Sequence, residues 1–90
     1  MKNRISEIQI TPIKPIDGLV GFASLVFDDS FYLGAIGIFT RPHGGFRLTY
    51  PTRKSLNKKL HVFHPINKEV ANDIEKAITT KFEEVTNSYT

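Results

Sequence analysis

The chain has 90 residues, 40% of them hydrophobic and 23% charged, which is enough for one hydrophobic core and predicts a single globular domain over residues 1–90. It contains no cysteine, which excludes disulfides, thiolate metal ligands and cysteine nucleophiles and favours a cytoplasmic location. The formal net charge is +3, and no apolar run approaches the roughly 18 residues that a membrane span needs.

The first half of the chain predicts an antiparallel meander of strands. In the first segment Ile8 and Ile10 alternate with polar residues, and Pro12 removes a backbone donor, so we expect an edge strand or a strand with a bulge. The second and third segments are apolar on both faces, and the fourth is short. Turn residues such as Asp17-Gly18 and Gly44-Gly45 separate them. The strands are expected at residues 4–14, 19–27, 31–39 and 46–50.

The second half of the chain predicts a loop and then a helix. Residues 52–60 are polar and basic and are interpreted as a loop, and residues 60–63 could add a short fifth strand. Apolar residues then recur at helical spacing, which predicts a helix over residues 68–85 with Asn67 as its N-cap. The expected fold class is α+β, an antiparallel sheet of four to five strands followed by a C-terminal α-helix.

The number of apolar faces predicts a second copy. One helix covers one face of a small sheet, yet the second and third strands are apolar on both faces. A homodimer could cover the other face, directly or by pairing of strand edges. The alternative is that the glycines and alanines on that face leave little to bury, so that the monomer suffices.

The sequence predicts no catalytic residue, no metal site, no cofactor and no small-molecule substrate. His43, His61 and His64 could in principle bind zinc, but the nearest carboxylates lie outside their basic surroundings. His64 precedes the predicted helix, where a hydrogen bond to the backbone is the more common role. No serine-nucleophile motif or phosphate-binding glycine loop is present.

Basic residues gather in the middle of the chain. From Ser30 to Lys68 there is no Asp or Glu, and this window holds seven basic residues, whereas the rest of the chain holds five basic and nine acidic ones. The charge is therefore +7 in the window and −4 outside it. Phosphate backbones are the commonest partner of such a region. A solvated basic loop without a partner is the alternative.

The candidate site is the basic segment and the strand before it. Arg53-Lys54 and Lys58-Lys59 are two basic pairs that can follow a phosphate backbone, and Tyr50 could stack on a base. The rival interpretation is a protein-interaction module whose basic loop docks an acidic protein. The helix balances its lysines with more carboxylates, so we place the contacts outside it. The predicted nucleic-acid-binding residues are Arg41, Arg47, Tyr50, Arg53, Lys54, Lys58 and Lys59.

Three motifs in order also resemble a known family. They are the segment from Gly21 to Phe31 with its Ala-Ser and Asp-Asp pairs, then Tyr50-Pro51-Thr52-Arg53-Lys54, then His64-Pro65-Ile66-Asn67. This order resembles the SpoVG family (stage V sporulation protein G). The resemblance implies a small bacterial cytoplasmic homodimer that binds DNA, and in some members RNA, with effects on transcription, septation or sporulation. The family's basic pair corresponds to Arg53 and Lys54.

The chain departs from the family pattern at two places. Residues 55–60 replace the family's Gly-Glu-Phe-type loop, and the predicted third strand has Gly34, Ala35 and Gly37 where the family has charged residues. The chain is therefore interpreted as a divergent member.

Overall fold

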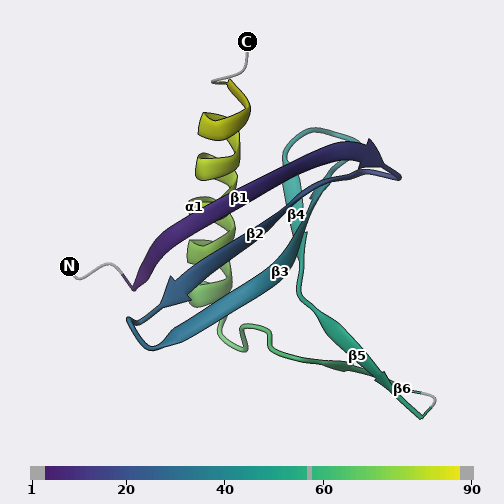
Figure 1. The fold of residues 1–90 in the computed structure, drawn as a ribbon, viewed down its shortest axis with the longest axis vertical. Coiled ribbons are helices and arrows are strands. Elements are labelled where there is room, and N and C mark those ends of the chain that lie inside the picture. The colour runs from purple at the N-terminus through teal and green to yellow at the C-terminus, as the bar shows by residue number, and fades with distance from the viewer. Residues whose placement is uncertain (1–3, 57, 88–90) are drawn as a thin grey trace.

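The computed structural model describes residues 4–56 and 58–87, which form six strands and one helix (Figure 1). Strands β1 to β4 make one antiparallel sheet in the order of the chain, and β5 and β6 pair separately. This arrangement confirms the predicted α+β fold with a helix after the sheet. The elements are β1 (Ile5–Ile16), β2 (Leu19–Phe27), β3 (Phe31–Thr40), β4 (Phe46–Thr49), β5 (Thr52–Ser55), β6 (Lys58–His61) and α1 (Lys68–Asn87).

Strand β1 is an edge strand with two irregularities, as its prolines and broken alternation predicted. Its pairing with β2 shifts register between Ser6 and Gln9 and again between Pro12 and Ile16. Glu7, inside the first shift, has a positive φ of 48°. Bulges of this kind twist an edge strand and interrupt its free hydrogen-bonding groups, which discourages pairing with other chains.

The core lies between α1 and one face of the sheet. Leu25 of β2 and Ile36 and Ile38 of β3 are fully buried in one cluster with Ile74 and Ile78 of α1. The helix lies across one face of the sheet (Figure 1). Burying one such side chain stabilises the fold by about 1.5–3 kcal/mol. The face that carries Ala23 and Leu25 is therefore the one that meets the helix, a choice the sequence had left open.

The opposite face of the sheet is open. Phe22 of β2 pairs with Gly37 of β3 and is 40% exposed, and Tyr32 at the other end of β3 is 73% exposed. No helix or strand among the described residues covers these side chains. The sheet thus has one covered and one uncovered apolar face, as expected for a single helix on strands that are apolar on both sides.

The interpretation of residues 52–60 as a loop was wrong, because these residues form a β-hairpin. Thr52 pairs with His61, and Ser55 pairs with Lys58. Only residues 60 and 61 of the suggested strand at residues 60–63 are in a strand, because β6 ends at His61. The described side chains of this hairpin are exposed, so no alternation of apolar and polar residues marks it. In Figure 1 the hairpin projects from the end of β4, away from the sheet and the helix.

Helix α1 begins where its N-cap was predicted. The backbone N–H of Val70 donates to the side-chain oxygen of Asn67 at 3.1 Å, and the N–H of Ala71 donates to the Asn67 carbonyl at 2.9 Å. The first bond satisfies a donor that a helix start otherwise leaves unpaired, and the second is the first regular hydrogen bond of the helix. The helix runs two residues beyond the predicted end at Val85.

Candidate nucleic-acid interface

Four of the predicted site residues lie together on the hairpin. Lys54 is directly opposite Lys59, and Arg53 is opposite Leu60. Paired residues share a side of a two-stranded ribbon and successive residues alternate. Lys54 and Lys59 therefore project from one side, and Arg53 and Lys58 from the other. All four side chains are exposed.

The charges of the hairpin are unbalanced. Among residues 4–56 and 58–87, no ion pair joins a carboxylate to any of its four cations. Like charges directly opposite each other destabilise an antiparallel pair, by about 0.2–1 kcal/mol on the usual scale for cross-strand pairs. The Lys54–Lys59 pair is such a case. An anion bound between the two ammonium groups would relieve this repulsion.

Arg47 lies on the open face of the sheet. It pairs with Phe39 across β3 and β4, and its guanidinium carbon is 4.8 Å from the centre of the Phe39 ring. This is a cation–π contact, which leaves the charge of Arg47 exposed at the edge of an apolar surface.

A hollow of about 560 Å³ lies between the open face and the base of the hairpin. None of the described residues that line it is acidic. The hairpin contributes cationic and titratable side chains to its wall, while the sheet contributes an apolar floor. The lining includes Leu19, Phe22, Gly37 and Phe39 of the sheet and Lys59 and His61 of the hairpin.

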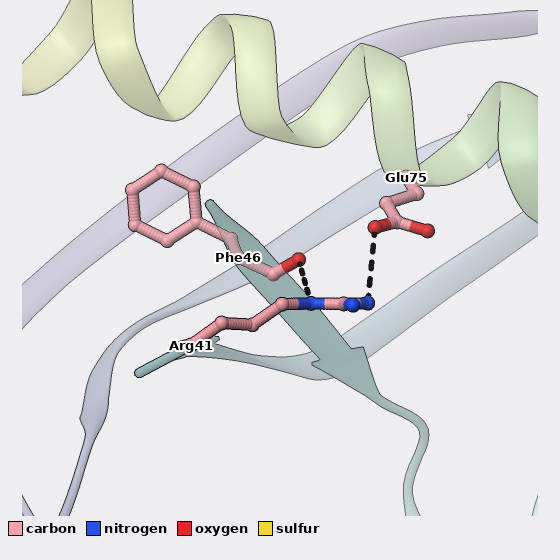
Figure 2. A network of polar contacts seen from close by, with 3 residues as sticks. All are labelled: Arg41, Phe46 and Glu75. Atoms are coloured by element: carbon pink, nitrogen blue, oxygen red, sulfur yellow. Dashed lines mark hydrogen bonds and ion pairs between the residues drawn. The ribbon is translucent and has the colours of Figure 1, made fainter. Parts of the chain in front are cut away.

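Arg41 contacts β4 and α1 (Figure 2). Its Nε donates to the carbonyl of Phe46 at 3.0 Å, and its Nη2 lies 3.5 Å from a carboxylate oxygen of Glu75 on α1. The two side chains are 52% and 41% exposed, so solvent screens this pair strongly. The contact nevertheless turns the Arg41 guanidinium toward the helix and places a negative charge beside it.

Comparison with known proteins identifies the family. Residues 3–84 match the model of the SpoVG family. The chain belongs to the SpoVG family. It is 33% identical over 86 residues to a protein of Phytoplasma australiense, covering 94% of this chain and 88% of the relative. It is 30% identical over 88 residues to one of Clostridium novyi (strain NT), covering 97% and 87%. Both relatives bear the name "Putative septation protein SpoVG".

The SpoVG motifs occupy two structural junctions. Pro51 leads from β4 into the hairpin, and its carbonyl accepts a hydrogen bond from the N–H of Val62 at 2.8 Å, which closes the base of the ribbon. Arg53 and Lys54, the basic pair of the motif, follow within β5. The His64-Pro65-Ile66-Asn67 motif joins the hairpin to α1 and supplies its N-cap. Both motifs therefore fix how the hairpin is attached.

Tyr50 of this SpoVG chain packs against the core and also lines the hollow beside the hairpin. It is partly buried, and its ring meets that of Phe63 edge to face at a centroid distance of 5.9 Å. Burial raises the pKa of the Tyr50 phenol above its usual value of 10.0, and the negative charge of Glu75 raises it further. The ring packs against Phe63, and the residue also lines the hollow that Lys59 of the hairpin lines.

The histidines form a structural contact. The rings of His61 and His64 lie 4.5 Å apart between centroids, and Nδ1 of His64 is within hydrogen-bond distance, 3.2 Å, of the Pro65 carbonyl. This confirms the predicted backbone contact of His64.

Within residues 4–56 and 58–87, no cluster of three or more potential metal ligands occurs. Over the same ranges, α1 lacks the apolar length needed to cross a bilayer.

Proposed function

We propose that this chain is a nucleic-acid-binding regulatory protein of the SpoVG type. It binds DNA or RNA in the bacterial cytoplasm through the β5–β6 hairpin and so influences gene expression, septation or sporulation. The observation that carries the proposal is the hairpin itself, which projects from the body and bears four exposed cations without a carboxylate partner among the described residues.

The hairpin suits a phosphate backbone better than the helix does. Arg53 offers a planar fork of donors that can hold a phosphate or the edge of guanine, and the lysines act as point charges. Helix α1 carries five acidic side chains against three lysines, which would repel nucleic acid over much of its exposed face. Contacts are therefore assigned to the hairpin.

A homodimer is the second part of the proposal. The monomer leaves large apolar side chains exposed, among them Phe31 at 62% and Tyr32 at 73% near the turn between β2 and β3. Covering such side chains with a second copy removes apolar surface from water. Two copies would present two hairpins, so one nucleic acid could be held at two places with higher affinity. Sedimentation equilibrium at micromolar concentration tests this, and a species with the mass of one chain would refute it.

Binding is tested by fluorescence anisotropy with labelled random-sequence duplex and single strands at several salt concentrations. The Arg53→Ala, Lys54→Ala double variant is expected to bind much more weakly than the wild type. Lys76→Ala, an exposed lysine on α1, is the matched control and should bind like the wild type. Unchanged binding by the double variant would remove the site from the hairpin. That result would favour the rival interpretation, in which the basic surface docks an acidic protein.

A further inference from the structure

The hollow beside the hairpin combines an apolar floor with a basic wall, and binding of phosphates by the hairpin cations gives no role to the apolar floor. We propose that it holds an unstacked base of a single-stranded nucleic acid, while the phosphates of that strand follow the hairpin. The inference rests on the proposed function and narrows it, because it names an unpaired strand as the preferred ligand and the open sheet face as the place where a base is bound.

The floor of the hollow is apolar. Phe22 pairs with Gly37, and Phe39 follows two residues along β3, so the two rings flank a backbone position without a side chain. A Cβ at Gly37 would lie 3.3 Å from the Phe39 ring and 2.5 Å from the Thr49 hydroxyl, so a larger residue there would displace the Thr49 side chain. Phe22 is 40% exposed and is therefore available for contact with a planar ring.

The wall of the hollow favours a negative charge. Lys59 and His61 line it from β6, and Arg47 lies over Phe39 at its edge. None of the described lining residues is a carboxylate. A ligand that complements both surfaces needs a flat apolar ring and an attached anion. A nucleotide has both, and aromatic side chains beside a basic groove are the usual platform for single strands.

The size of the hollow also favours a nucleotide. Its volume of about 560 Å³ lies within the range of small-ligand sites, roughly 300–1,000 Å³. A stable protein partner would instead need a broad surface of about 800 Å². A base pair inside a duplex exposes only its edges in the grooves, so stacking on Phe22 requires an unpaired base.

The experiment compares two forms of the same sequence with two matched variants. Anisotropy is measured with a labelled oligothymidine single strand and with its duplex, for wild type, Phe22→Leu and Tyr32→Leu. Leucine keeps an apolar side chain but removes the aromatic face. Tyr32 is more exposed than Phe22 and is not among the residues lining the hollow, so its variant controls for the loss of any exposed ring. Thermal melting and sedimentation velocity of each variant are recorded alongside.

The expected result is selective loss of single-strand binding. Phe22→Leu should weaken the single strand by about 5-fold or more, as for removal of a base-stacking ring, and should leave the duplex within about 2-fold. Tyr32→Leu should keep the wild-type ratio of single-strand to duplex affinity, because any effect on the second copy acts on both ligands alike. If Phe22→Leu binds both ligands normally, the base site is refuted while the hairpin proposal stands.

Two further outcomes would also overturn the inference. If Phe22→Leu becomes monomeric and loses single-strand and duplex binding equally, a second copy covers the open face. If the wild type binds neither ligand even at low salt, the proposed function fails and the base site fails with it. These outcomes are distinguishable because duplex affinity reports on binding by the hairpin, whereas sedimentation reports whether a second copy is bound.

Discussion

Replacing the opposed lysines of the hairpin should change the salt dependence of duplex binding by a calculable amount. Lys54 and Lys59 face each other across β5 and β6, and Arg53 and Lys58 lie on the other side. If each of these four cations neutralises one phosphate, a hairpin contributes about −3.6 to the slope of log affinity against log salt, from roughly −0.9 per phosphate. The Lys54→Gln, Lys59→Gln double variant should therefore flatten the slope by about 1.8 per hairpin.

The same change should not unfold the hairpin. Removing two like charges from directly opposite positions relieves repulsion of about 0.2–1 kcal/mol, so the variant should be at least as stable as the wild type. The measurement is a series of duplex titrations between about 50 and 200 mM salt, the range over which counterion release dominates. Lys76→Gln on α1 is the control for simple loss of positive charge, because it removes a cation from a helix rich in carboxylates.

Two results would refute this reasoning. An unchanged slope in the double variant would mean that these lysines contact no phosphate. A flattening of about 0.9 in Lys76→Gln, half that of the double variant, would mean that net charge, and not the position of the cations on the hairpin, controls binding.

Three other predictions concern the residues around the site. Asn67→Ala should lower the free energy of unfolding by about 1 kcal/mol in denaturant titrations, because the bond from the Val70 N–H is lost. Arg41→Ala should cost less than about 1 kcal/mol, since its ion pair with Glu75 is largely exposed, and should leave the duplex salt slope unchanged. The phenol of Tyr50 should titrate above pH 10.0 in ultraviolet difference spectra. Because its pKa is raised in the folded state, the unfolded chain loses this proton first, so stability should fall as the pH rises above that value, and Tyr50→Phe should remove this part of the alkaline loss.

The sheet and the helix could be predicted from the sequence because burial leaves a periodic pattern. Strand β2 was predicted with its observed bounds, and the stripe from Val70 to Val85 predicted α1. The hairpin could not be predicted in this way. Its described side chains are exposed, so selection for a buried face has left no alternation, and its turn places Leu56 at a φ of 57°, a conformation usually marked by Gly, Asn or Asp.

The candidate site was predicted in part. The two basic pairs were identified from charge alone, and the pairing of β5 with β6 brings them onto one ribbon. The ion pair of Arg41 and part of the raised pKa of Tyr50 depend on Glu75, which is far away in sequence and comes near only when α1 packs on the sheet. The hollow was missed for a similar reason, since it combines residues of β2, β3 and the hairpin that share no local motif.

The order of the elements along the chain also governs how the protein folds during synthesis. Each strand of the sheet pairs only with its neighbours in sequence, so β1 to β4 can assemble by successive local hairpins as they leave the ribosome. The helix that covers Leu25 and Ile36 is made after all four strands of the sheet. At about 5–20 residues per second, the growing sheet keeps two apolar faces in water for several seconds. During this interval the nascent chain is at its most prone to aggregation, and a chaperone that binds exposed strands would act then.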